Sequence, residues 1–133
     1  MATMSHLSGP IDVRVPARAD SLRILRAVAA GVGAAEDMPI DAIEELRIAV
    51  DEAATLLLRS TTGSTSLHLR IHVDGDVVRL DVTSDGRAET WPPAGLREAW
   101  PWLVITGLMD AVDAASTGTP TLSFQTRPRA NET

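Results

Sequence analysis

The stretch DAIEELRIAVDEAATLLLRS, residues 41–60, decides the fold because it predicts one long helix in the middle of the chain. Asp41 and Glu44 have the spacing of a capping box, so we expect the helix to begin at Asp41. Its main face is apolar or small at steps of three and four residues: Ile43, Leu46, Val50, Ala53 and Leu57. A second row beside this face contains one acid, Glu52, with Leu56 one turn further on. We expect such a helix to be buried on two sides.

Glu52 is the first candidate for a functional residue, because an acid among apolar and small residues needs an explanation. One interpretation is structural, with the carboxylate at a helix edge, where it reaches solvent or pairs with an arginine. The other is chemical, with Glu52 as a general base or a ligand-orienting carboxylate in a cleft beside a sheet. The residues alone leave both interpretations open.

The composition is that of a folded protein with an aliphatic core, since 44% of the 133 residues are hydrophobic but only one is Phe and none is Tyr. This length suits a single domain. The formal net charge of -6 argues against direct binding to nucleic acid and favours a basic protein surface as the partner. The absence of Cys excludes disulfides, thiolate metal sites and cysteine catalysis.

The pattern predicts one domain with short flanks. We expect residues 1–9 to be a disordered lead, residues 10–126 a single folded domain and residues 127–133 a flexible tail. The first ten residues lack the charged and then apolar pattern of a secretion signal, and no apolar run approaches the length of about 18 residues that a membrane helix needs. We therefore expect a cytoplasmic protein with no membrane segment.

Two elements are predicted before the long helix. Residues 11–15 alternate between apolar and polar, which indicates a half-buried strand. Residues 17–32 have the spacing of a helix. Its ends are marked by Asp20 or Ser21 as the cap, and by Gly31 and Gly33 as the stop.

After the long helix the pattern turns to strands. Asp74 and Gly75 form a strong hairpin signal between two alternating runs. The predicted elements are a strand at 66–73, its return strand at 78–82, a loop at 84–99, a helix at 102–112 with Pro101 in its first turn, a short strand near 111–116 and a last strand at 121–126. The order β-α-α-β-β-α-β-β predicts an α+β sandwich, with one sheet covered on one face by helices.

Several other kinds of site are not supported. His68 and His72 lie four residues apart on a strand, roughly 13 Å, which is too far for both imidazoles to hold one ion. They fit a solvated sheet surface better, and we expect no metal site. No Gly-x-Ser-x-Gly motif is present, and the glycines at 31 and 33 follow a helix rather than a strand, which excludes a dinucleotide loop.

The sequence LRIAVDEAA, residues 46–54, resembles the anti-sigma serine kinases of the RsbW kind, within the GHKL (histidine-kinase-like) ATPase superfamily. The resemblance runs from Val13 to Phe124 and includes the element order, the helix pair, the hairpin, Gly86, the LMDAV segment at 108–112 and the closing Gly118 and Thr119. It implies a two-layer sandwich of the histidine-kinase-like ATPase (Bergerat) type, with a mixed, mostly antiparallel sheet and helices on one face.

The resemblance also implies an ATP and Mg²⁺ site, but the residues at its positions have changed. The family places a Glu base and, four residues on, a metal-holding Asn on the long helix, and these positions are Glu52 and Leu56. Leu56 has no atom that binds a hard cation. The second family box, Asp-x-Gly-x-Gly, falls on residues 84–88, where the adenine-reading Asp is Ser84, Asp85 is one position out of register, and only Gly86 is kept.

The third family box, a Gly-Arg-Gly run that contacts phosphates, falls on residues 99–101. Pro101 has no N–H to offer a phosphate, and Trp100 and Trp102 are expected to crowd the pocket. The closing Gly118 and Thr119 match the family. Because phosphoryl transfer depends on positioned metal ions and dipoles, we predict a pseudokinase with weak or no ATP-dependent activity.

The resemblance implies that the partners are a sigma factor of the sigma-B/F type, which the protein sequesters, and an anti-anti-sigma (STAS) antagonist. Arg26 on the first helix matches a family position used in partner contact, and the family forms homodimers. Three hypotheses follow: a sigma-sequestering protein with little or no ATP turnover, an active serine kinase of an anti-anti-sigma factor, or a module with another partner, such as a sensor whose Trp-rich pocket holds a small molecule.

Overall fold

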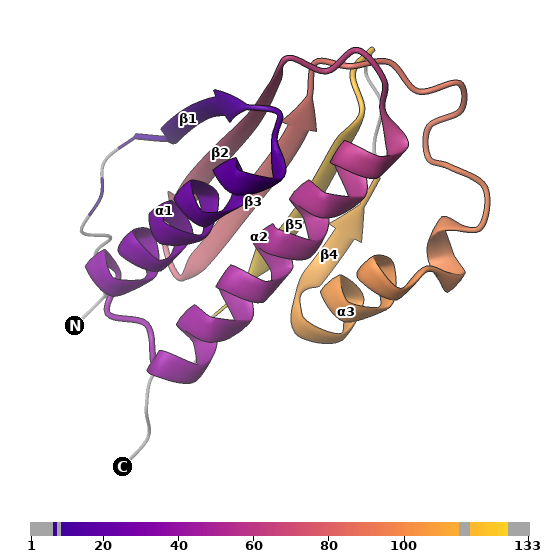
Figure 1. Cartoon of the computed structure of the whole chain (residues 1–133). Helices are drawn as coiled ribbons and strands as arrows, with labels where there is room; N and C mark the ends of the chain where they lie inside the picture. Colours follow the sequence, from indigo (N-terminus) through magenta and orange to yellow (C-terminus); the bar gives the residue numbers. More distant parts are fainter. Residues whose placement is uncertain (1–6, 8, 115–117, 128–133) are drawn as a thin grey trace.

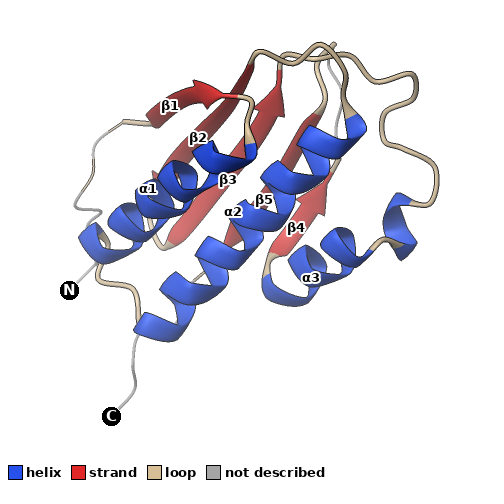
Figure 2. Cartoon of the chain, viewed as in Figure 1, coloured by secondary structure: helices blue, strands red, loops and turns tan. Residues whose placement is uncertain are grey.

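The computed structural model describes Leu7 and residues 9–114 and 118–127, which form a sheet with helices on one of its faces (Figure 1). The strands are β1 Ile11–Pro16, β2 Ser66–Asp74, β3 Val77–Ser84, β4 Asp110–Asp113 and β5 Thr121–Thr126. The helices are α1 Leu22–Ala35, α2 Ile40–Ser60 and α3 Trp100–Leu108, with short 3-10 turns η1 Ala19–Ser21 and η2 Leu96–Glu98. Figure 2 shows the two layers, and the predicted α+β sandwich and element order are confirmed.

The sheet has the strand order β1-β2-β3-β5-β4. All four pairings between these strands are antiparallel, so the mixed component of the expected sheet is absent from the described strands. The predicted last strand at 121–126 is confirmed, and the first strand extends one residue beyond the prediction, to Pro16. The predicted hairpin is also present, but Asp74 pairs with Val77, so the turn consists of residues 75 and 76.

The core lies between α2 and the sheet. The predicted main face of α2 is confirmed, with Leu46, Val50, Ala53 and Leu57 completely buried. Their partners in the core include the inward-facing residues of three strands, Leu69, Leu80 and Phe124. The second row of α2 is only partly buried, because Leu56 is buried whereas Ile48 is 43% exposed. Burial of α2 on two sides is therefore only partly correct.

The predicted boundaries of the first two helices are wrong. α1 begins at Leu22 rather than at residue 17, after the turn η1, and Ser21 at its N-cap forms no side-chain capping bond. α2 begins at Ile40 after Pro39, and no side chain caps it, so Asp41 lies inside the first turn and the predicted capping box does not form. A carboxylate in the first turn still interacts favourably with the helix dipole. α1 continues through both glycines to Ala35. At Gly33 a Cβ would lie 2.8 Å from Cγ1 of Ile43, so this glycine allows α1 and α2 to approach closely.

The third helix is shorter than predicted. α3 ends at Leu108 rather than Val112, because Met109 is extended and β4 starts at Asp110. Pro101 lies in its first turn, as predicted. β4 corresponds to the predicted short strand near 111–116, of which residues 115 and 116 lie outside the described residues, as do most residues of the predicted lead and tail.

The face of the sheet opposite the helices is polar. His68 lies there and its Nε2 is 2.9 Å from Oδ1 of Asp12 on β1, while His72 is exposed. The two histidines therefore lie on a solvated surface, as predicted. Within the described ranges, no cluster of three or more His, Cys, Asp or Glu residues has the arrangement of a metal site, and no helix is long and apolar enough to cross a membrane.

Candidate functional site

The candidate nucleotide positions meet where α2 ends and β3 ends, and Ser84 lies at their centre. Ser84 is completely buried at the last position of β3. Its hydroxyl oxygen accepts the backbone N–H of Gly86 at 3.0 Å. The same oxygen lies 3.0 Å from Oγ1 of Thr61 and 2.9 Å from Oγ of Ser64. These contacts use the donor and acceptor capacity of a hydroxyl, so Ser84 joins the end of α2 to the loop that follows it.

Asp85 is exposed, but its carboxylate is fully engaged by the loop between α2 and β2. One oxygen accepts the backbone N–H groups of Thr65 and Ser66 at 2.8 and 3.0 Å, and the hydroxyls of Ser64, Thr65 and Ser66 also donate to the carboxylate. The N–H of Ser66 is the main reason that the pKa of Asp85 lies well below its usual range. The carboxylate therefore holds a loop in place, as an anion.

Gly86 is required by the packing of the backbone. Residues 62 and 87 form a short antiparallel bridge, with both N–H groups donating across it at 2.8 and 2.9 Å. A Cβ on Gly86 would lie 2.9 Å from the carbonyl oxygen of Thr62 and 3.0 Å from the Cβ atoms of Thr61 and Ser64. This crowding gives a structural reason for the one glycine kept from the second family box.

Gly118 and Thr119 lie beside the same group of residues. The backbone N–H of Ser84 donates to the carbonyl of Pro120 at 3.1 Å, which places the turn before β5 against the end of β3. The hydroxyls of Thr83 and Thr121 reinforce this contact at 3.1 Å. The structure thus brings together five of the candidate residues, Ser84, Asp85, Gly86, Gly118 and Thr119.

Glu52 and Leu56 occupy the helix side of the candidate site. Glu52 is half-buried and forms no hydrogen bond or ion pair with any residue in the described part of the chain. The alternative in which it pairs with an arginine is therefore wrong. Leu56 is 7% exposed and belongs to the core. The next residue, Leu57, accepts the Thr61 hydroxyl at 2.7 Å, which links this turn of α2 to the contacts of Ser84.

These residues do not fit a magnesium nucleotide. A hard cation needs several oxygen ligands, but Leu56 offers none, and the oxygens of Ser84 and Asp85 are already used within the protein. Among the candidate nucleotide residues, Glu52 is the one whose carboxylate binds no group in the described part of the chain. Pro101 in the first turn of α3 lacks an N–H. Trp100 is 72% exposed, so the expectation that it crowds the site is wrong, whereas Trp102 is buried.

Arg26, the predicted partner-binding residue, lies on α1 and is not a free cation. Its guanidinium pairs with the carboxylate of Asp51 on α2, and the two side chains are 36% and 35% exposed. Two large apolar side chains on the same helices are also exposed, Ile24 on α1 at 47% and Ile48 on α2 at 43%. This ion pair could not be predicted from the sequence, because Arg26 and Asp51 are 25 residues apart.

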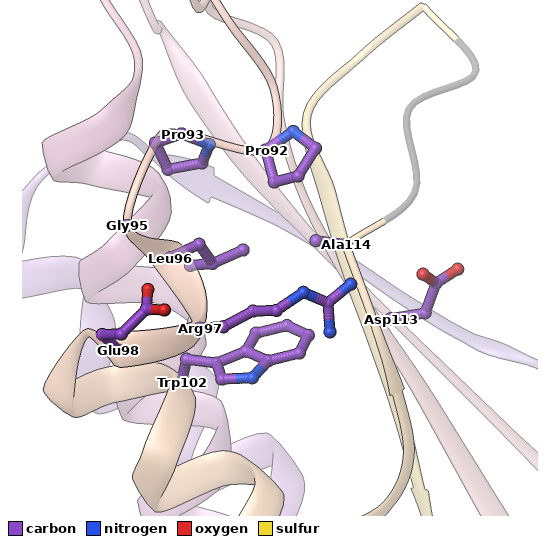
Figure 3. A pocket seen from close by; sticks show the side chains of 9 residues that line it. All are labelled: Pro92, Pro93, Gly95, Leu96, Arg97, Glu98, Trp102, Asp113 and Ala114. Atoms are coloured by element: carbon purple, nitrogen blue, oxygen red, sulfur yellow. The ribbon is translucent and has the colours of Figure 1, made fainter.

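A separate pocket of about 360 Å³ opens between η2, the start of α3 and the end of β4 (Figure 3). Its walls are formed by Pro92, Pro93, Gly95, Leu96, Arg97, Glu98, Trp102, Asp113 and Ala114. The guanidinium carbon of Arg97 lies 5.6 Å from the ring centroid of Trp102, a cation–π contact. The sequence suggested a Trp-rich pocket only in general terms, and none of the candidate nucleotide residues lines this one.

Comparison with known proteins gives a match to a family model and a match to a relative of known name. The model of a family described as the histidine kinase-like ATPase domain matches residues 15–124. The anti-sigma-F factor RsbW of Mycobacterium tuberculosis, in strains CDC 1551 / Oshkosh and H37Rv, is 31% identical to the chain over 108 residues. This alignment covers 81% of the chain and 62% of the relative, so the chain spans less than two thirds of the relative's length.

Two solved structures share the fold. The crystal structure of the RsbU and RsbW domains of Rv1364c from Mycobacterium tuberculosis has a TM-score of 0.73 and 16% identity, over 91% of this chain and 33% of that one. The histidine kinase domain of the blue-light activated histidine kinase from Erythrobacter litoralis EL346 has a TM-score of 0.58 and 12% identity, over 86% of this chain and 62% of that one. These likenesses confirm the predicted type of sandwich.

Proposed function

The chain belongs to the histidine kinase-like ATPase domain family, in its RsbW-like group, and from that membership we propose that it is an anti-sigma factor. In this proposal it binds and sequesters an alternative sigma factor of the sigma-B/F type, in the cytoplasm. An anti-anti-sigma protein of the STAS type releases the sigma factor. The identity of 31% with the anti-sigma-F factor RsbW of Mycobacterium tuberculosis is the observation that carries this proposal.

We propose that the protein acts by binding and has weak or no ATP-dependent kinase activity. Phosphoryl transfer depends almost entirely on positioned metal ions and dipoles. The buried Leu56 cannot bind Mg²⁺, and the oxygens of Ser84 and Asp85 hold the protein together instead of facing a ligand. The single remaining carboxylate, Glu52, does not replace these groups.

The outer surface of α1 and α2 is the proposed partner surface. Arg26 and Asp51 are each about one third exposed there, and Ile48, one turn of α2 before Asp51, adds exposed apolar area beside the pair. Such a combination of a partly exposed arginine with an apolar neighbour is typical of protein–protein hot spots. Because Asp51 holds Arg26, a partner either displaces this carboxylate or contacts the pair as a unit. A homodimer, as in the family, is part of the same proposal.

The direct test is binding to a purified sigma factor of the sigma-B/F type from the same genome, followed by calorimetry and size-exclusion chromatography with light scattering. We expect a stable complex that contains two copies of the chain. Arg26→Ala should weaken it by about tenfold or more, as a hot-spot arginine does. Arg79→Ala is the matched control, because Arg79 is an exposed arginine on β3, on the face of the sheet opposite the helices. It should change the affinity by less than about twofold.

The possible outcomes test the proposed function and the proposed partner surface separately. Failure of every sigma factor of this type to bind refutes the proposed function. A complex that Arg26→Ala leaves unchanged refutes the proposed surface and leaves the function standing. Titration with Mg-ATP tests the kinase alternative: we expect no binding below about 1 mM. Magnesium-dependent binding in the micromolar range, with phosphate transfer to a STAS partner, establishes an active kinase instead.

A further inference from the structure

The pocket between η2, α3 and β4 is a candidate ligand site that is separate from the candidate nucleotide residues. Its volume of about 360 Å³ lies within the range of about 300–1,000 Å³ typical of small-molecule sites. Pro92, Pro93, Leu96 and Trp102 give it apolar walls, as such sites usually have. None of its residues coincides with Glu52, Leu56 or the group around Ser84, so a ligand here does not depend on the lost nucleotide contacts.

Arg97 is the polar group that gives this pocket its chemistry. Its guanidinium carbon lies 5.6 Å from the ring centroid of Trp102, a cation–π contact that favours a position over the indole. Within the described residues Arg97 forms no hydrogen bond or ion pair, so its N–H donors are available to a ligand. In Figure 3 the guanidinium lies in the pocket beside Ala114.

Two acids, Glu98 and Asp113, also line the pocket. Neither Glu98 nor Asp113 forms an ion pair with Arg97, and both carboxylates point away from the guanidinium in Figure 3. Glu98 lies on the other side of η2, and Asp113 points away from Arg97 beyond β4. An arginine that lies over Trp102, has no ion-pair partner among the described residues and stands beside apolar walls favours a carboxylate that carries an apolar group.

We propose that this pocket binds a small apolar carboxylate, an aromatic or medium-chain aliphatic acid whose carboxylate pairs with Arg97. The apolar part of the ligand lies against Leu96, Trp102 and the prolines. This site does not rest on the proposed anti-sigma function, and it is the same whether or not a sigma factor binds. Its position at η2 and the start of α3 gives a ligand direct contact with the segment that joins β3 to α3.

The test uses calorimetry on the full chain with four probes: indole-3-acetate, octanoate and their uncharged amides, indole-3-acetamide and octanamide. We expect at least one acid to bind about tenfold or more tightly than its amide, because charge-assisted hydrogen bonds to arginine supply the difference. Arg97→Gln should remove this preference, and Arg97→Lys should keep part of it. Arg79→Gln, an exposed arginine on the opposite face of the sheet, should leave it unchanged.

Nuclear magnetic resonance then locates the ligand. The acid should shift the indole N–H signal of Trp102 and the Nε–H signal of Arg97, which Arg97→Gln identifies by its disappearance. The tighter of the two acids shows whether the apolar part is aromatic or aliphatic. The proposal is overturned if no acid binds below about 1 mM, if acid and amide bind equally, or if Arg97→Gln retains the preference. Because Arg97 is exposed, its variants are expected to fold normally.

Discussion

Replacing Gly86 with alanine separates two explanations for this glycine, which is the one residue kept from the second family box. If Gly86 is needed for packing, alanine must destabilise the fold in the absence of any ligand. The new Cβ would lie 2.9 Å from the carbonyl oxygen of Thr62 and 3.0 Å from two further carbon atoms. The first of these is a backbone atom, held by the bridge between residues 62 and 87, so it cannot move aside without loss of two hydrogen bonds.

Overpacking of this kind costs about 1–3 kcal/mol. We therefore expect Gly86→Ala to reduce the free energy of unfolding by that amount, which corresponds to a fall in Tm of about 4 °C per kcal/mol for a chain of this size. Urea denaturation followed by circular dichroism measures the change directly, provided that the slope of the transition is the same in both proteins.

Gly31→Ala is the matched control. Gly31 lies in α1, and a Cβ there would meet no atom within 4 Å. Alanine in a helix interior is about 0.5–1 kcal/mol more favourable than glycine, so this variant should be more stable than the natural protein. If Gly86→Ala unfolds within about 0.5 kcal/mol of the natural protein, the packing explanation is wrong and Gly86 needs another function.

Three further predictions concern the residues around Gly86. Ser84→Ala removes a buried hydroxyl that contacts Thr61, Ser64 and Gly86, and should lower the unfolding free energy by about 1–3 kcal/mol in the same urea experiment. The lowered pKa of Asp85 means that its contribution to stability is present above its unfolded-state pKa of about 4 and is lost as the pH falls below it. Asp85→Asn should therefore show a smaller decrease of Tm between pH 6 and pH 3, and an unchanged decrease contradicts the assignment. Leu56→Asn puts an amide into the core and should cost about 2–4 kcal/mol without creating Mg-ATP binding by calorimetry, because the oxygens of Ser84 and Asp85 remain engaged.

The elements that sequence periodicity predicted well are those whose signal is local. The main face of α2 repeats every three or four residues, and four of its five predicted residues are completely buried. The boundaries were less predictable, because they depend on neighbours. Gly33 suggested a helix end, but it lies inside α1, where the side chain of Ile43 on α2 leaves no space for a Cβ.

The contacts of the candidate site were predicted less well, for a related reason. The family resemblance identified the positions of Ser84 and Asp85 but not what they bind. Asp85 contacts residues 19–21 positions earlier in the chain, and no pattern in a single sequence reveals such a pairing. The Ser- and Thr-rich loop at 61–66 was the available signal, since it offers many donors beside an acid. Arg97 and Trp102 are five positions apart, but the pocket exists only because β4 packs beside them.

The hydrogen bonds of Ser84 and Asp85 bear on any binding of a nucleotide at the second family box. A ligand that uses the oxygens of Asp85 must first displace Ser64, Thr65 and Ser66, which donate to that carboxylate. A ligand that uses the oxygen of Ser84 must displace the backbone N–H of Gly86. Binding of ATP through Asp85 therefore has to leave the N–H groups of Thr65 and Ser66 to water. Hydrogen exchange at Thr65 and Ser66 makes this coupling measurable: a ligand bound through Asp85 should accelerate it, whereas a ligand of the Arg97 pocket should not.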